Sequence, residues 1–329
     1  MTDDLFPVTY STLDSSTLAR RVLPQYGIWD VASCQFWNRG LSDVYVVETP
    51  KKRYILRVSH HHWRSQTDIE FELELLDFLR QRHLPVAHPL RTTEGNLFVA
   101  IAAPEGQRYA ALFTYAPGEI ALGDLNLKQS QKLGETLAKV HQTALDFRTH
   151  ADRQPLTPDY LLGHSLNAIA PFLQHRPQDL DYLEGAIAQI EEQLQDFPKE
   201  APFWSICWGD PHSGNAHFTR DERITLFDFD QCGYGWRAFD LGKFLQVALR
   251  GGVPTTVRDA FFSGYQSVQA VTEWELNALQ AFTQMAHIWV WGINIHWAVI
   301  HNWCRLDEHY FTRRLEQLKR LTSRDWQLF

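Results

Sequence analysis

The chain has 329 residues, of which 44% are hydrophobic and 21% are charged, and its formal net charge is −8. This length and composition predict a globular protein whose core is large enough for two lobes. The 39 acidic against 31 basic side chains exclude a general nucleic-acid-binding protein, which would carry a basic surface.

The sequence gives no sign of export or of a membrane anchor. Residues 1–4 are acidic and are not followed by the apolar core of a secretory signal. Residues 281–303 come nearest to a membrane span, but His and Asn side chains interrupt them. The four widely separated cysteines form no C-x-x-C pair, which predicts reduced thiols rather than a zinc site or disulfides. We expect a cytoplasmic protein without membrane contacts. The cysteines are Cys34, Cys207, Cys232 and Cys304.

The first predicted elements are two β-strands at 44–49 and 54–58, preceded by the glycine-bearing segment 38–43. A glycine turn before two strands is a suitable cover for nucleotide phosphates. The segment is not G-x-G-x-x-G, however, and any β-hairpin could produce the same pattern.

An amphipathic helix is predicted from Ser65 to Arg82, because Ile69, Leu73, Leu76 and Leu79 recur at helical spacing. The preceding His60-His61-His62 could hold a metal, but we favour a solvated connecting loop. Three further strands are expected at 88–92, 97–102 and 107–115, between turn signals. The first part of the chain is therefore predicted to form a five-stranded sheet with one helix.

From Gly118 onward the pattern is mainly helical. Leu133, Leu137, Val140 and Ala144 form one buried face, and residues 158–175 and 180–196 read as further helices. Near the C-terminus a polar stripe lies on an otherwise apolar helix. It either lines a pocket or hydrogen-bonds to buried neighbours, and the sequence leaves both readings open. Its members are His287, Trp291, Asn294, Ala298 and His301.

The stretch 206–230 carries the residues best suited to chemistry. It reads as a short strand, a turn-rich loop, a strand beginning near Asn215, a polar turn, and a second strand that ends in Asp228 and Asp230. Phosphoryl transfer needs one Asp to accept a proton from the incoming hydroxyl, and an Asp and an Asn to hold magnesium. The alternative is a solvated acidic hairpin, which the spacing from Asp210 disfavours.

The pattern W-G-D-P-H-S-G-N followed by F-D-F-D resembles the H-G-D-x-H-x-x-N and D-[WF]-D signature of the aminoglycoside phosphotransferase and choline kinase superfamily. The resemblance covers residues 34–250 and is strongest at 207–242. It implies an α+β, two-lobed protein-kinase-like fold that binds ATP and Mg²⁺ between its lobes. Residues 1–115 would form the nucleotide-binding lobe, an antiparallel sheet plus a helix. Residues 116–329 would form the mainly helical catalytic and acceptor-binding lobe.

By this resemblance Asp210 is the catalytic base, Asn215 and Asp228 bind the metal, and Asp230 is a supporting or second ligand. Trp208 stands where the family commonly has a His that braces the loop, so this exchange affects the geometry of the loop more than its chemistry. The resemblance also implies that Asp240 is structural and hydrogen-bonded back to the catalytic loop, and it favours a core role for His141.

Arg57 falls where the family places a strand cation that binds the α- and β-phosphates, although Lys is the usual residue there and Arg is not a neutral exchange. A plain surface charge is the alternative. Glu72 is the expected partner of Arg57 on the following helix, with Glu70 and Glu74 as solvated alternatives.

The resemblance also places a Gly-Ser phosphate loop at Gly40 and Ser42, with Asp43 where Asn is frequent. It places the adenine beside the connection between the lobes, which makes Phe113 and Tyr115 the candidate adenine contacts.

The function so predicted is ATP- and Mg²⁺-dependent transfer of the γ-phosphate to a hydroxyl of a small polar acceptor, of the amino alcohol, homoserine, choline or aminoglycoside type. Length and layout resemble the homoserine-kinase-like and bacterial stress-response-kinase branches. The acidic balance and the aromatic C-terminal helix favour a cationic acceptor. A Ser/Thr protein kinase is one alternative, and a pseudokinase, suggested by Arg57 and Trp208, is another. The sequence does not indicate an oligomeric state.

Overall fold

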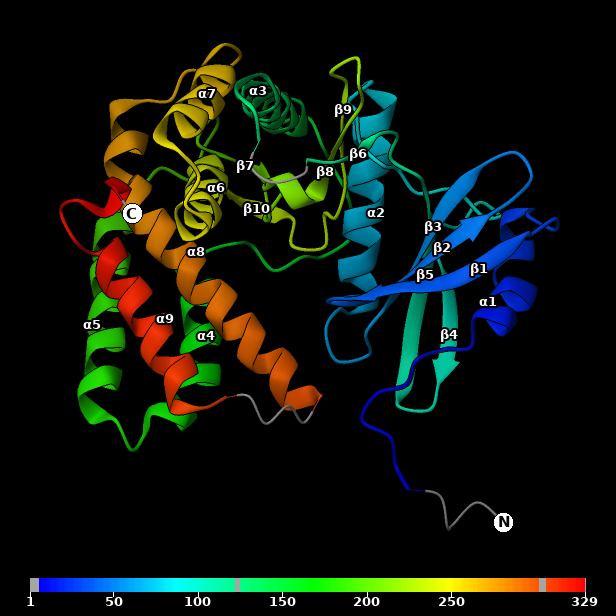
Figure 1. Ribbon diagram of the computed structural model, residues 1–329, viewed down its shortest axis with the longest axis horizontal. Coiled ribbons are helices and arrows are strands. Elements are labelled where there is room, and N and C mark those ends of the chain that lie inside the picture. Colours follow the sequence, from blue (N-terminus) through cyan, green and yellow to red (C-terminus); the bar gives the residue numbers. More distant parts are fainter. Residues whose placement is uncertain (1–5, 122–124, 302–305, 329) are drawn as a thin grey trace. The chain divides into compact units, whose positions relative to one another are not determined.

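The computed structural model describes residues 6–121, 125–301 and 306–328 (Figure 1). The chain divides into two compact units, one of residues 1–116 and 149–152, the other of residues 117–148 and 153–329. Cys304 and the acidic residues 1–4, about which the sequence raised expectations, lie outside the described residues.

The first unit is built on a five-stranded sheet in the order β1-β2-β3-β5-β4, with every neighbouring pair antiparallel. Its elements are α1 (Ser15–Arg21), η1 (Leu23–Tyr26), β1 (Ser33–Arg39), β2 (Ser42–Glu48), β3 (Arg53–Ser59), α2 (Gln66–Gln81), β4 (Val99–Ala103) and β5 (Gly106–Thr114). The helix predicted from Ser65 to Arg82 is confirmed as α2. Its N-terminus is fixed by a capping box in which Ser65 and Asp68 bond each other's backbone N–H.

The two faces of this sheet have different partners, because side chains alternate along each strand. Tyr45 and Val47 of β2 and Leu56 of β3 are fully buried against α1 and η1. Arg57, the next residue on β3, projects to the opposite face, where it meets Glu72 of α2. Figure 1 shows the sheet with α1 at one side and α2 at the other.

One of the five strands differs from the prediction. Residues 88–92 do not form a strand, and Pro89 makes only an isolated bridge to Phe113, since proline cannot donate to a ladder. The fifth strand is instead β1, whose aromatic Phe36 and Trp37 are exposed and which carries a bulge after Phe36. An exposed, bulged edge strand lacks the alternating pattern by which strands are recognised. The glycine turn therefore lies between two strands, β1 and β2, rather than before them.

Asp43 is a buried structural residue of this sheet. Its side chain and that of Arg108 are both fully buried, and Arg108 Nη2 lies 2.9 Å from Asp43 Oδ2. Burial by itself would raise the pKa of Asp43, but hydrogen bonds from His60 and Tyr10 and the Arg108 guanidinium hold it well below its usual value. The Asp43 carboxylate is therefore ionised and paired inside the unit.

The second unit is mainly helical, as predicted. Its helices are α3 (Leu127–Ala144), α4 (Pro158–Leu173), α5 (Pro177–Leu194), α6 (Arg237–Gly251), α7 (Thr255–Gln266), α8 (Glu273–Ile300) and α9 (Glu308–Leu321), with 3₁₀ turns η2 (Ser213–Asn215) and η3 (Trp326–Leu328). Two small sheets complete it, β10-β7 and β6-β8-β9. Their strands are β6 (Glu119–Ile120), β7 (Trp204–Cys207), β8 (Ala216–Phe218), β9 (Ile224–Leu226) and β10 (Gly233–Trp236).

Helices α6 and α8 are locked together at their N-termini. Arg237 at the start of α6 forms a buried bidentate ion pair with Glu275 of α8, at 2.6 and 2.7 Å. One turn later Gly242 allows close approach, because a Cβ there would lie 2.7 Å from Phe282. The position of α6 is therefore set by α8.

Of the polar stripe, His287, Trp291 and Ala298 are buried on α8. His287 is 1% exposed and its Nε2 bonds the Arg314 carbonyl of α9 at 3.0 Å, which supports, for this residue, the reading of hydrogen bonds to buried neighbours. None of the helices among residues 6–121, 125–301 and 306–328 is long and apolar enough to cross a membrane.

The buried Asp43–Arg108 pair yields a stability prediction. Arg108→Met should lower the unfolding free energy by about 3–5 kcal/mol, because it leaves the buried Asp43 carboxylate without its guanidinium. Arg53→Met is the matched control, since Arg53 pairs with Glu48 at the surface, where the two side chains are 52% and 47% exposed, and it should change stability far less than Arg108→Met does. Urea unfolding measures both. Equal losses would show that burial of the pair is unimportant.

Candidate active site

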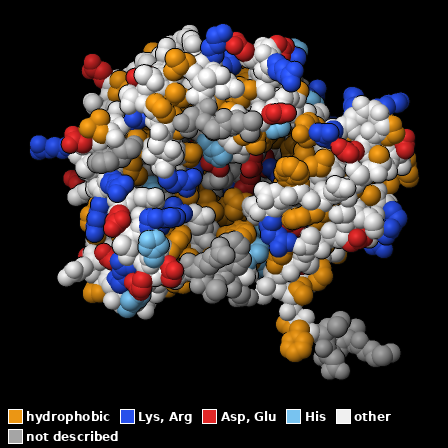
Figure 2. Space-filling view, in the orientation of Figure 1, with side chains coloured by type: hydrophobic (Ala, Val, Ile, Leu, Met, Phe, Trp, Pro, Cys, Tyr) orange, Lys and Arg blue, Asp and Glu red, His pale blue; other side chains and the backbone are white. Residues whose placement is uncertain are grey.

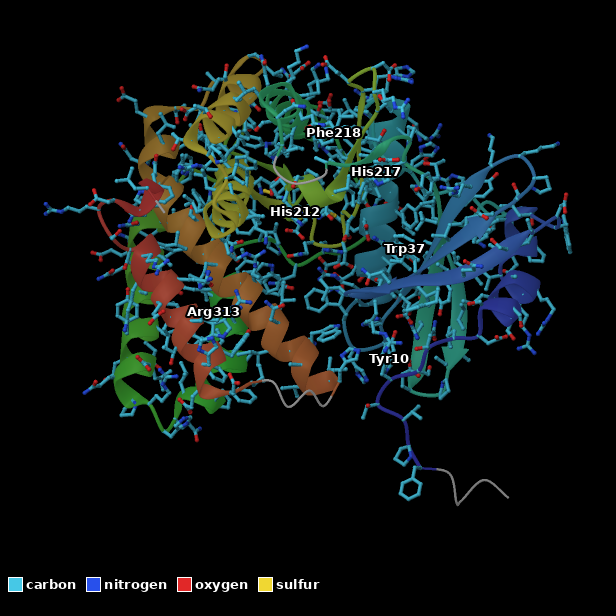
Figure 3. All side chains as sticks on the ribbon, viewed as in Figure 1. Tyr10, Trp37, His212, His217, Phe218 and Arg313 are labelled. Atoms are coloured by element: carbon cyan, nitrogen blue, oxygen red, sulfur yellow. The ribbon has the colours of Figure 1, made fainter. Side chains whose placement is uncertain are left out.

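The loop after β7 is forced into a sharp turn at Gly209. This residue has φ of +87°, and a Cβ at its position would lie 2.1 Å from the Gln231 carbonyl oxygen. Only glycine fits such a site. The turn places Asp210 and His212 on the loop that leads through η2 into β8, where Figure 3 labels His212, His217 and Phe218.

The Asp240 carboxylate anchors this loop. Its Oδ2 accepts the Trp208 N–H at 2.7 Å and its Oδ1 accepts the Gly209 N–H at 2.9 Å. His141 Nε2 lies 2.9 Å from the same Oδ2, and His141 Nδ1 lies 2.8 Å from the Tyr265 hydroxyl. Asp240 is fully buried and His141 is 1% exposed. The structure thus brings both residues together in the structural roles that the sequence suggested.

Asp240, His141 and Cys207 also offer ligand atoms within 4.8 Å of one another. Both oxygens of Asp240 already accept backbone N–H groups. We therefore assign this cluster to hydrogen bonding of the loop rather than to metal binding.

Trp208 replaces the usual His with a different brace. Its ring is fully buried and stacks on Phe229, with ring centres 5.4 Å apart. Its Nε1–H donates to the carbonyl oxygens of Phe227 at 3.2 Å and Asp228 at 3.0 Å. Asp228 has φ of +58°, a conformation that costs a non-glycine residue about 1–3 kcal/mol. The indole therefore fixes a strained acidic segment to the loop that carries Asp210.

Asp210 sits among groups that keep it ionised. Lys243 Nζ lies 3.1 Å from Oδ1, and His212 Nε2 lies 3.5 Å from Oδ2. Gln231 Nε2 also donates to Oδ2 at 3.2 Å. Burial opposes the charge, but the Lys243 ammonium, followed by His212, lowers the pKa of Asp210 far below its usual value. Asp210 is therefore a carboxylate throughout the physiological pH range.

Sequence reasoning missed Lys243, which is only 3% exposed. A signal was present: Lys243 follows Asp240 by three residues on a helix, so both lie on one face. Since Asp240 was expected to hold the loop that bears Asp210, a lysine one turn further along should also reach that loop.

Asn215 is placed directly beside Asp210. It is 7% exposed, and its Nδ2 donates to the Asp210 backbone carbonyl at 3.1 Å and lies 3.4 Å from Oδ2. The Asn215 Oδ1 is thereby left for another partner. The Phe227 N–H bonds the Asn215 carbonyl at 3.0 Å, which holds Asp228, the next residue, at the same end of the β8–β9 ribbon.

The oxygens of Asn215 and Asp228 fit a hard divalent cation such as Mg²⁺, which prefers carboxylate and carbonyl ligands. Asp228 is exposed, whereas Asp230 is 4% exposed and its backbone carbonyl accepts a hydrogen bond from Arg153. Metal binding by these three residues stays a prediction.

In the first unit, Arg57 pairs with Glu72 in the bidentate arrangement, at 2.8 and 2.5 Å. Glu72 is fully buried. The two alternatives are engaged elsewhere, since Glu70 accepts from Gln66 and Glu74 accepts from Thr149. The Arg57 guanidinium, 12% exposed, is held rigidly, and its contact with phosphates stays a prediction.

The other residues expected to bind the nucleotide lie on or beside strands of the same sheet. Gly40 lies in the β1–β2 turn and Ser42, 7% exposed, begins β2. Phe113 is buried, with the Arg57 guanidinium 4.8 Å from its ring centre. The backbone on either side of it is already paired, Leu112 O with Leu90 N–H and Thr114 N–H with His88 O. Contact of Phe113 and Tyr115 with the adenine stays a prediction.

A second missed feature is an aromatic wall of the second unit. Trp289 Nε1 donates to Gln231 Oε1 at 2.9 Å, and the same Gln231 bonds Asp210. Tyr160 lies 5.3 Å and His164 5.9 Å from the Trp289 ring, and His296 lies 5.9 Å from His164. Trp289 and His296 are seven residues apart on one face of α8. This face adjoins the polar stripe that the sequence analysis identified.

Comparisons with known proteins agree on family and fold. The model of the phosphotransferase enzyme family matches residues 33–278. An uncharacterized protein of Synechocystis sp. is 53% identical over 326 residues, which cover 99% of this chain and 90% of that protein. The solved amicoumacin kinase hAmiN, in complex with AMP-PNP, Ca²⁺ and Ami, has a TM-score of 0.73 and 21% identity, with 88% of each chain covered.

The microcompartment-associated aminopropanol kinase has a TM-score of 0.73 and 19% identity, covering 92% of this chain and 94% of that one. At such identities the likeness shows the fold. The α+β kinase-like fold expected from the sequence, an antiparallel sheet followed by a helical portion, is confirmed.

The brace by Trp208 can be tested without touching an acidic residue. Trp208→Phe keeps the stacked ring but removes the Nε1–H, so stability should fall by about 1–3 kcal/mol. The amides of residues 227–229 should exchange faster with solvent, since their carbonyl anchor is lost. Hydrogen–deuterium exchange measures this, with Trp204→Phe in the same segment as the control. Unchanged exchange at 227–229 in Trp208→Phe would contradict the assignment.

Proposed function

Because the chain belongs to the phosphotransferase enzyme family, we propose that it transfers the γ-phosphate of ATP to a hydroxyl group of a small polar acceptor. The family assignment agrees with the superfamily expected from the sequence. The observation that carries the proposal is the grouping of the Asp210 carboxylate with Asn215 and Asp228, held by Asp240 and Trp208.

The proposed role of the N-terminal lobe, residues 1–115, is to bind the nucleotide. Arg57 contacts the α- and β-phosphates, and Glu72 fixes its guanidinium through the bidentate ion pair. Gly40 and Ser42 would face the phosphates from the β1–β2 turn. Phe113 and Tyr115 would contact the adenine.

The C-terminal lobe, residues 116–329, would supply the chemistry. Asn215 and Asp228 would hold Mg²⁺, with Asp230 as a supporting ligand, and the ion would supply positive charge that offsets charge developing on the phosphates. Asp210 accepts a hydrogen bond from the acceptor hydroxyl and so aligns its oxygen with the γ-phosphorus. As the new O–P bond forms and the bond to ADP breaks, the hydroxyl proton passes to Asp210.

The low pKa of Asp210 suits an orienting role. A loose transition state needs little proton abstraction before the phosphoryl group moves, so a weakly basic carboxylate suffices. Lys243 and His212 keep the carboxylate ionised and ready to accept the proton late in the reaction.

One observation weighs against a pseudokinase. The residues that prompted this alternative are both engaged: Arg57 is paired with Glu72, and Trp208 holds the Asp228 carbonyl. A small acceptor agrees with the solved relatives, whose names give aminopropanol and amicoumacin as substrates. A protein substrate stays the second candidate.

Two carboxylate variants separate the proposed roles. Asp210→Asn should leave MgATP binding nearly intact while the transfer rate falls roughly 10²–10⁴-fold, about 3–5 kcal/mol of barrier. Asp228→Asn should weaken MgATP binding as well, because it removes a charged ligand from the cation. Steady-state ADP release and isothermal titration of ATP, with and without Mg²⁺, measure both effects.

The matched control is Asp221→Asn, an exposed acid in the turn of the same hairpin that pairs with Arg223. It should behave as wild type. Wild-type turnover by Asp210→Asn would disprove its role as the base, and ATP affinity that is independent of Mg²⁺ would disprove the metal site.

A further inference from the structure

One face of α6 carries a row of basic and amide side chains that begins beside Asp210. Lys243, Gln246 and Arg250 follow one another at helical spacing and so share that face. Lys243 contacts Asp210 at 3.1 Å. Arg250 lies seven residues further on, about 10 Å along the helix axis. The row therefore leads away from the reacting carboxylate by about two turns.

Two buried polar groups of this region have no hydrogen-bond partner among the described residues. Gln246 is 2% exposed, and neither its Oε1 nor its Nε2 is bonded. On α9, Arg314 is 7% exposed and its Nε is unbonded. Buried groups of this kind are nearly always satisfied, and each costs about 1–3 kcal/mol when they are not. A bound ligand would supply the missing partners.

The charges around this row are predominantly positive. The charged side chains that act on Arg250 are Arg314, Arg313 and, with opposite sign, Asp210. Asp210 is itself occupied by Lys243. Figure 3 shows Arg313 on α9, and Figure 2 shows Lys and Arg side chains over the α8 and α9 region of this unit.

His287 of α8, which lies between these cations, does not add to the charge. Burial, then the nearby Arg314, lowers its pKa to about 3, with smaller effects of Arg250 and Lys243. The region therefore combines several cations, an unsatisfied amide and a neutral histidine. Such a set is complementary to an anion.

We propose that the acceptor carries an anionic group, a carboxylate or a phosphate, which Gln246, Arg250 and Arg314 bind while its hydroxyl faces Asp210. This inference rests on the proposed phosphotransferase function. It replaces the preference for a cationic acceptor that was drawn from composition. The chain as a whole has a net negative charge, but the side chains of this row are basic or neutral. Among the expected acceptors it favours those with a carboxylate, and it adds sugar and polyol phosphates.

Matched acceptors test the charge preference directly. 4-Hydroxybutyrate is compared with 4-amino-1-butanol, and glycerol 3-phosphate with glycerol, so that the carboxylate and phosphate arms are separate. Binding is measured by calorimetry without nucleotide, and turnover by ADP release. In at least one pair the anion should bind ten or more times more tightly than its partner.

Arg250→Gln tests the site itself, since Arg250 is exposed and its replacement should not disturb folding. The affinity for the anionic acceptor should fall about 10–100-fold, the loss expected for a charged hydrogen bond. The affinity for MgATP should stay within twofold. The control is Arg320→Gln, at an exposed arginine on α9, which should change neither the affinity for the anionic acceptor nor that for MgATP.

The proposal is overturned if the amine or neutral compound binds as tightly as the anion in both pairs, or if no anion binds. It is also overturned if Arg250→Gln leaves the affinity for the anion unchanged. Equal loss of affinity for the anion and for MgATP would overturn it too, because the row would then bind the nucleotide rather than the acceptor. Failure of the phosphotransferase function is distinct: MgATP would not bind and no acceptor would release ADP, whatever the anion affinities.

Discussion

The candidate site depends on one interaction, the acceptance of two consecutive backbone N–H groups by the buried carboxylate of Asp240. Charge-assisted hydrogen bonds of this kind are short and strong in a buried setting. They fix Trp208 and Gly209, and thereby the direction in which Asp210 leaves the turn. Trp208 passes this constraint on, because its indole holds the carbonyls of Phe227 and Asp228.

Helix α6 joins the parts of this site that the chain keeps far apart. It begins with Arg237, whose ion pair with Glu275 fixes the helix on α8. Its first turn supplies Asp240, its second supplies Lys243, and its last carries Arg250. The loop anchor, the charge partner of the base and the proposed acceptor contact are thus placed by one rigid element, as precise positioning in catalysis requires.

The sequence predicted what local patterns determine. The helical period found α2, the motif spacing found the grouping of Asp210 with Asn215, and the family resemblance implied the pairing of Arg57 with Glu72. It failed where tertiary contacts decide. The edge strand β1 has no buried alternation, and Pro89 broke a strand that apolar content suggested. The spacing of Lys243 from Asp240 on one helix carried a signal that the sequence reasoning did not use. Trp289 gave no such signal, because it reaches the site only through its contact with Gln231.

The most direct test of this account is the turnover of Asp240→Asn, an isosteric change that replaces one accepting oxygen with an amide that cannot accept the backbone N–H. The protein should remain folded by circular dichroism, while kcat for ADP release falls about 10²-fold or more because the Asp210 loop is displaced. Turnover within twofold of wild type would contradict the claim that this carboxylate organises the site.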